Sequence, residues 1–173
     1  MHEGAFVGFR ALQGILRLWR SGFVIGILIM NSVFLGMMNS HDLPVNQSIV
    51  IVEGFAAAGA AWSCIDLGFT LFSGFCVVSL IVIPVEAFMV GCYIFIATVY
   101  KPALGDCKGY ADTPFGDIMG VDGLTSVRDP CGMQTANFAL SIIAAILSGG
   151  CILIEFINGV LRCASDDGFS DLI

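Results

Sequence analysis

The chain has 173 residues, of which 57% are hydrophobic and 12% are charged, and its formal net charge is −7. A soluble domain carries about twice that charged fraction, and the few, scattered cations exclude nucleic-acid binding. The length suits one compact domain over residues 1–173, with no room for a separate soluble domain.

The first long apolar run covers residues 22–38, and a helical lead-in precedes it from about residue 7. Four polar side chains of this lead-in recur every three or four residues and so share one helical face: Arg10, Gln13, Arg17 and Arg20. We predict one long helix from Val7 to Met38, kinked or tilted near Gly22. The alternative is a separate amphipathic helix that lies in the membrane interface.

Three further apolar runs follow, over residues 49–72, 76–100 and 138–161. A bilayer core needs about 20 apolar residues per helix, which all four runs reach or approach. The connections are residues 39–48, a turn at 73–74 and a longer loop over 101–134. We therefore predict an all-α integral membrane four-helix bundle with up-and-down topology.

The cations near the span ends suggest the orientation in the membrane. Three arginines precede the first span and Arg162 closes the fourth, whereas the 39–48 loop has no Lys or Arg. Lys101, Lys108 and Arg128 in the longer loop weaken this asymmetry. We expect both termini in the cytoplasm.

The cysteines outside the spans predict two modifications. Cys107 and Cys131 bracket the second outer loop, where an oxidising compartment favours a disulfide; the alternatives are free thiols or a metal pair without its other ligands. Cys163 follows Arg162 just past the fourth span. It is either a palmitoylation site or an unmodified thiol.

Four carboxylates lie inside the spans, where an unpaired charge costs several kcal/mol. They are Glu53 and Asp66 in the second span, Glu86 in the third and Glu155 in the fourth. A rise of about 1.5 Å per residue places the last three in one layer, about 10–15 Å from the inner ends of their spans. Glu53 lies near the outer end of its span, close enough to reach water.

Two interpretations of the inner acids compete. If the first helix is continuous, Arg17 and Arg20 reach the same layer and pair with the acids. These buried ion pairs would then hold the helices together. The functional alternative is a proton or cation path. A path needs a polar lining, and the spans supply almost none, with Thr70 and Ser79 as the few candidates. We favour pairing.

Small residues mark faces on which helices can approach closely. The first span has Gly22 and Gly26, and two further groups occur: Gly54, Ala57, Ala58 and Ala61 in the second span, and Ser148, Gly149 and Gly150 in the fourth. These faces serve either internal packing or contacts with another copy or a partner protein.

Nothing in the sequence supports an enzyme. The two histidines, His2 and His41, lie outside the spans, and no Ser or Cys nucleophile has a histidine partner in prospect. No metal site or cofactor is predicted.

The layout resembles the MARVEL-domain membrane proteins, the fungal-type members above all. The matching segments are Arg10-Ala-Leu-Gln13 before the first span, Val85-Glu86-Ala87 in the third, and Asp129-Pro-Cys131 followed by Thr135-Ala-Asn-Phe-Ala139 at the fourth. The chain departs from the family in its acidic tail. The resemblance implies a non-enzymatic protein of plasma-membrane or vesicle membranes that organises lipid microdomains and partner proteins.

Two other functions remain open on the sequence. The first is a small proton or cation transporter, or a channel subunit, that uses Asp66, Glu86 and Glu155. The second is an accessory structural subunit of a large membrane complex, with the small-residue faces as docking surfaces.

Overall fold

The computed structural model describes residues 2–40, 45–72, 76–104 and 128–170, and the side chains of residues 11–40, 45–69, 81–102 and 132–159. Four long helices make up almost all of this part: α1 (His2–Ser40), α2 (Gln47–Phe72), α3 (Cys76–Tyr100) and α4 (Arg128–Ser170). A short 3₁₀ helix, η1 (Lys101–Leu104), follows α3.

All four long helices contain segments long and apolar enough to cross a membrane. These segments are Ala11–Ser40, Gln47–Phe69, Ile81–Tyr100 and Gly132–Gly159, with mean hydropathies of 1.9, 1.6, 2.0 and 2.3. Each reaches the length of about 20 residues that a bilayer core requires.

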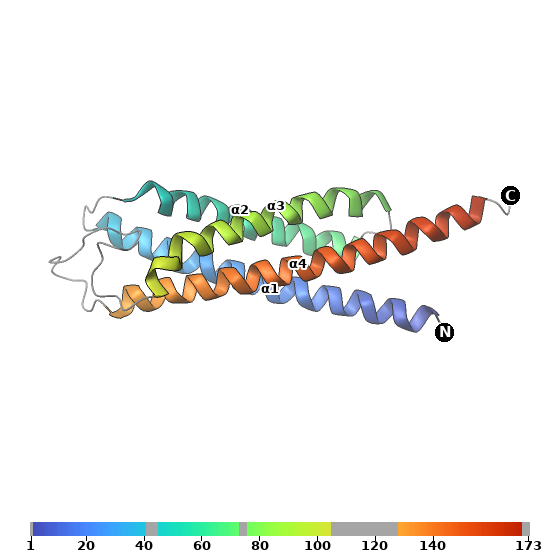
Figure 1. Ribbon diagram of the computed structural model, residues 1–173, viewed down its shortest axis with the longest axis horizontal. Coiled ribbons are helices and arrows are strands. Elements are labelled where there is room, and N and C mark those ends of the chain that lie inside the picture. Colours follow the sequence, from blue (N-terminus) through green and yellow to red (C-terminus); the bar gives the residue numbers. More distant parts are fainter. Residues whose placement is uncertain (1, 41–44, 73–75, 105–127, 171–173) are drawn as a thin grey trace.

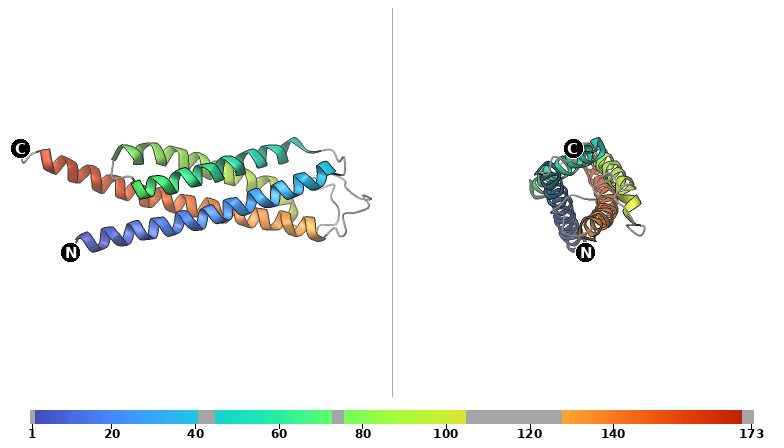
Figure 2. Two further views of the ribbon diagram at one scale, coloured as in Figure 1. Left: turned by 180° about the vertical axis from the view of Figure 1, so that it is seen from behind. Right: turned by 90° about the vertical axis from the view of Figure 1, so that its left-hand side faces the viewer.

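The helices lie lengthwise beside one another, and the chain reverses direction between consecutive helices (Figure 1). α1 packs against α2 and α4, and α3 packs most extensively against α4, whereas α2 and α3 pack less closely against each other. Seen end on, the helices surround a common core (Figure 2). Both termini lie at one end, which we call the terminal end, and the opposite end is the loop end.

The buried residues of each helix follow a heptad pattern, with spacings that alternate between three and four residues. In α1 they are Gln13, Arg17, Arg20, Val24, Ile27, Asn31, Phe34 and Met38, and in α4 they are Gln134, Asn137, Ser141, Ala144, Ser148, Cys151, Glu155 and Asn158. This repeat keeps one seam of each helix turned toward its neighbours, as in coiled coils.

The polarity of this arrangement differs from that of a soluble bundle, because most polar side chains of the described residues face inward and many large apolar ones face outward. Outward-facing examples are Ile146, Leu153, Phe88 and Trp19, each more than 60% exposed. Lipid is the solvent that suits such a surface, and inward polar groups are the pattern of membrane bundles.

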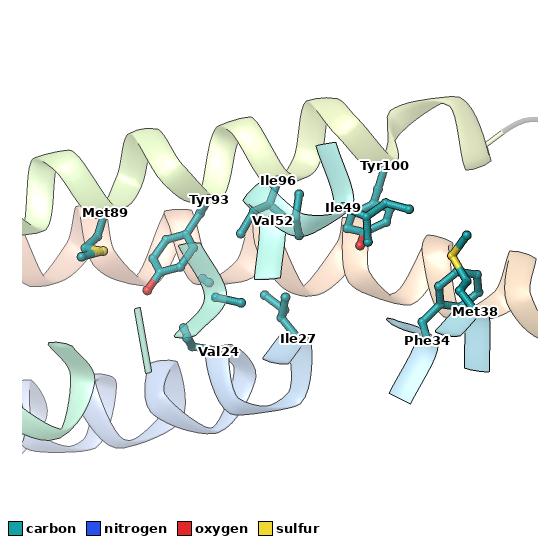
Figure 3. Close-up of a cluster of buried hydrophobic side chains, with 12 residues drawn as sticks. Val24, Ile27, Phe34, Met38, Ile49, Val52, Met89, Tyr93, Ile96 and Tyr100 are labelled. Carbon is teal, nitrogen blue, oxygen red and sulfur yellow. The ribbon is translucent and has the colours of Figure 1, made fainter. Parts of the chain in front are cut away.

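An apolar belt occupies the middle of the core (Figure 3). We use this name for Val24, Ile27, Val52, Ala56, Ile96 and Ala144, all 0% exposed and drawn from all four helices. Gly59 of α2 lies beside it, where an added Cβ would come within 2.9 Å of the Tyr93 hydroxyl and 3.2 Å of Val24 Cγ1. Only glycine at this position therefore lets α2 approach α1 and α3 this closely.

The structure corrects some predicted boundaries. α3 has the predicted bounds, and α1 continues through Gly22 as one helix. α4 begins at Arg128, ten residues before the predicted start at Phe138, so Cys131 belongs to a helix instead of a loop. The turn at 73–74 and most of the 101–134 loop lie outside the described residues.

The predicted small-residue faces mostly point outward. Gly54, Ala57, Ala58 and Ala61 are exposed, and the core-facing small residues of α2 are Ala56 and Gly59. In α1, Gly22 is exposed, whereas Gly26 faces α4, with Leu140 3.7 Å from the place of a Cβ. In α4, Ser148 is buried and Gly149 and Gly150 are half-buried.

Candidate functional site: a buried charged layer

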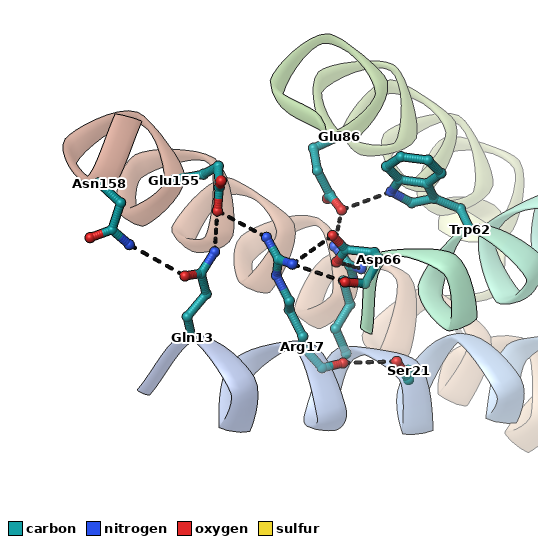
Figure 4. Close-up of polar contacts among 9 residues, drawn as sticks. Gln13, Arg17, Ser21, Trp62, Asp66, Glu86, Glu155 and Asn158 are labelled. Carbon is teal, nitrogen blue, oxygen red and sulfur yellow. Dashed lines mark hydrogen bonds and ion pairs between the residues drawn. The ribbon is translucent and has the colours of Figure 1, made fainter. Parts of the chain in front are cut away.

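α1 brings two arginines into the core near the terminal end. Arg17 and Arg20 occupy consecutive positions of the heptad seam, and they are 3% and 1% exposed. Their long side chains reach the other three helices across the core, where Asp66, Glu86 and Glu155 face them (Figure 4). We call these five residues the charged layer.

Asp66 of α2 joins the two arginines. Its Oδ1 lies 2.8 Å from Arg17 Nη1, and its Oδ2 lies 2.7 Å from Arg20 Nη2. Arg17 Nη1 also donates a hydrogen bond to the Asp66 backbone carbonyl at 3.0 Å. The Asp66 side chain is fully buried, so these guanidinium contacts replace the water that an isolated carboxylate would require.

Glu86 of α3 is held from two directions. Arg20 Nη1 and Trp62 Nε1 both donate to its Oε1, the latter at 2.8 Å. Its other oxygen, Oε2, is buried and has no hydrogen-bond partner among the residues that the structure describes. The carboxyl group is therefore satisfied on one oxygen only.

Glu155 of α4 lies at the terminal edge of the layer, with its side chain 10% exposed. Arg17 Nη2 donates to its Oε2 at 3.0 Å, and Gln13 Nε2 donates to the same oxygen. Asn158 Nδ2 in turn donates to Gln13 Oε1 at 3.3 Å. This chain of contacts ties α1 to α4 at the end where both helices extend past α2 and α3 (Figure 1).

The charged layer thus connects all four helices through α1. Arg17 contacts α2 and α4, and Arg20 contacts α2 and α3. Removing one partner from such a buried group leaves an uncompensated charge, at a cost of about 3–5 kcal/mol. A slip of α1 by one residue would separate the partners, so the layer specifies the register of the helices.

A second polar group lies nearer the loop end, and the sequence interpretation missed it. Tyr100 donates its hydroxyl hydrogen to Asn31 Oδ1, and Asn137 hydrogen-bonds the same hydroxyl. Gln134 lies one turn from Asn137 and is 1% exposed. We call Asn31, Tyr100, Gln134 and Asn137 the amide cluster.

The expectation that the spans offer almost no polar lining was therefore wrong. Besides the amide cluster, the hydroxyls of Ser63, Ser141 and Ser148 are buried in the core. The signal was available in the heptad spacing of the polar residues of α4. The side chains of Thr70 and Ser79, the two candidates from the sequence, lie outside the described residues.

The fourth predicted acid, Glu53, stands apart from the charged layer. It is half-buried on α2 toward the loop end and accepts a hydrogen bond from Ser32 Oγ of α1. The structure therefore places it in a different setting from the other three acids, as its position in the span predicts.

Of the predicted cysteine sites, Cys107 lies outside the described residues, as do the side chains of Cys131 and Cys163. The predicted disulfide and palmitoylation therefore stay predictions. Within the described part, Cys64, Cys92 and Cys151 are free thiols. No group of three His, Cys, Asp or Glu side chains in this part could hold a metal ion.

Comparisons with protein-family models, with curated proteins and with solved structures find no match to this chain.

Proposed function

We propose that this chain is a non-enzymatic protein that spans a membrane four times, with up-and-down topology, and organises the lipids or proteins around it. The observation that carries the proposal is the charged layer, in which Arg17 and Arg20 contact acids from three other helices. Such a buried network suits a rigid scaffold, because its charged groups are engaged with one another.

The outward surface supports membrane lipids as one partner. A groove of about 230 Å³ runs between α3 and α4, lined mainly by apolar side chains such as Ile94, Phe138 and Ile142, with Lys101 among its lining residues. An acyl chain suits such a groove, since dispersion contacts with lipid replace those of a neighbouring helix.

The exposed small residues of α2 support a second kind of partner. Gly54, Ala58 and Ala61 are exposed, and an added Cβ at Gly54 would meet no atom within 4 Å. Close approach of another helix favours such residues. We infer a homo-oligomer or a protein partner on this face.

The location of the protein follows from the same proposal. We place both termini in the cytoplasm and the chain in the plasma membrane or a secretory or vesicle membrane. The MARVEL-domain resemblance, the Cys107–Cys131 disulfide and palmitoylation at Cys163 belong to this proposal too. Mass spectrometry of the unreduced protein tests both cysteine modifications.

A small proton or cation transporter is the second candidate, and one observation favours it: the layer has three acids for two arginines. The apolar belt, whose six residues are 0% exposed, opposes it, because a path must cross this dry segment. An accessory subunit of a larger complex is the third, and fixed-stoichiometry co-migration in gentle detergent would support it.

Reconstitution into liposomes tests these functions. We expect no proton or cation flux above that of empty liposomes for the natural chain, and loss of the folded bundle for Asp66→Asn, which removes the acid that joins both arginines. Glu53→Gln, outside the layer, is the matched control and should fold. If the natural chain conducts and a folded Asp66→Asn or Glu86→Gln variant does not, the organiser function is contradicted and transport is supported.

A further inference from the structure

The groove between α3 and α4 lies on the outward surface, in the half of the bundle nearer the loop end. Its lining on each helix follows helical spacing: Ile94, Ala97, Thr98 and Lys101 on α3, and Phe138, Ile142, Ala145 and Ile146 on α4. These two helices pack more extensively than any other pair (Figure 1). We propose that the groove is a phospholipid site, with one acyl chain along the groove and the phosphate at Lys101. This inference rests on the proposed function, in which membrane lipids are a partner.

The groove is hollow because small side chains lie between larger ones. Ala97 is 8% exposed and Ala145 is half-buried, so they form its floor. The exposed apolar side chains that form its walls include Ile94, Ile142 and Ile146. An extended acyl chain would contact floor and walls along its length. A helix about 10–12 Å across would rest on the walls and leave the floor uncovered, so a lipid chain is the better occupant.

Lys101 lies at the loop-end mouth of the groove, where the apolar span ends. The span of α3 ends at Tyr100, and Lys101 is the next residue and is exposed. It begins η1, which packs against both α3 and α4, so its backbone is held beside the groove. From Ile94 to Lys101 the helical rise gives about 10 Å, within the half-thickness of about 15 Å of a bilayer core. The ammonium therefore lies at the level of the lipid headgroups.

The charge at the mouth selects the class of lipid. The Lys101 ammonium has three donors and no acceptor, and phosphate oxygens are acceptors of opposite charge. Thr98, one turn deeper, donates its hydroxyl hydrogen to the Phe95 backbone carbonyl at 2.7 Å, so it requires no acceptor from the lipid. Charge complementarity therefore favours a phospholipid over a diacylglycerol, which has the same chains but no phosphate.

Native mass spectrometry of the full chain in detergent tests this site. The probes are three lipids with the same chains: dioleoylphosphatidylglycerol, dioleoylphosphatidylcholine and dioleoylglycerol. Both phospholipids should bind, at one per chain, because both carry the phosphate. Dioleoylglycerol should bind about fivefold more weakly, the factor expected for one lysine near the membrane surface.

Two variants separate the mouth from the groove. Lys101→Gln should weaken phospholipid binding about fivefold, to the level of dioleoylglycerol, and Lys101→Arg should preserve it. Ala97→Leu should weaken binding of all three lipids, because the larger side chain fills the floor. Ala87→Leu, at an exposed position of α3 outside the groove, is the matched control and should change nothing. Lys101→Gln alters an exposed side chain and should fold, so the test holds even if Ala97→Leu does not fold.

Three results would each overturn the inference: equal binding of dioleoylglycerol and the phospholipids, unchanged binding in Lys101→Gln, or unchanged binding in a folded Ala97→Leu chain. Flotation with liposomes separates such a result from failure of the proposed function. A chain that floats but does not distinguish the headgroups lacks only this lipid site. A chain that does not float contradicts the membrane proposal itself.

Discussion

The charged layer and the amide cluster solve the same problem in different ways. Both place polar side chains in the core of an apolar bundle, but the charged layer links all four helices through two arginines. In the amide cluster, Tyr100 bonds two asparagines, while both amide atoms of Gln134 lack a partner among the described residues. Leaving a buried charge without its partner costs more free energy than leaving a neutral amide without one. The charged layer should therefore fix the register of the helices more strongly than the amide cluster does.

The largest effect should come from breaking the charged layer at Arg20. Arg20→Gln removes the contacts to Asp66 and Glu86 and leaves Glu86 without its arginine partner, so we expect a loss of about 3–5 kcal/mol of stability. Unfolding in detergent measures it. Arg20→Lys should rescue only part of the loss, because a single ammonium lacks the fork that reaches two acids; full rescue would contradict the two-acid contact.

Packing between the two polar groups should have a smaller effect. Gly59→Ala would place a Cβ 2.9 Å from the Tyr93 hydroxyl, and such overpacking costs about 1–3 kcal/mol. Adding Tyr93→Phe should recover part of the loss by removing the hydroxyl. The matched control is Gly54→Ala, which meets no atom within 4 Å and should leave thermal stability unchanged; equal losses at both glycines would contradict the close approach of α2.

The amide cluster should tolerate loss of its central group better than the charged layer does. Tyr100→Phe removes the hydroxyl that joins Asn31 and Asn137, and a hydrogen bond of this kind contributes about 1 kcal/mol. The same unfolding measurement applies. A loss as large as that of Arg20→Gln would mean that the two polar groups are energetically equivalent, which would break the comparison.

The smallest effect should come from Glu53. It is half-buried and bonded to Ser32, outside both polar groups, so Glu53→Gln should change stability by less than about 0.5 kcal/mol. A large loss of stability in Glu53→Gln would mean that a buried acid also holds the helices together at the loop end of the bundle.

The four helices were predictable because long apolar runs leave no other secondary structure in a bilayer, and the depth of each acid follows from a constant helical rise. The start of α4 was not, since the polar segment from Arg128 to Gln134 reads as a loop by composition. Small residues alone did not show which face of α2 turns inward. The amide cluster was missed because the predicted loop ended at Gln134, although Gln134 and Asn137 share the heptad spacing of Glu155.

The central claim is that the charged layer holds the four helices in register. A double-mutant cycle on Arg17 and Glu155, with Arg17→Gln, Glu155→Gln and the double variant, tests it most directly through the free energy of unfolding. We predict a coupling energy of about 1–3 kcal/mol, with the double variant more stable than the sum of the single losses implies. A coupling energy indistinguishable from zero would contradict the account.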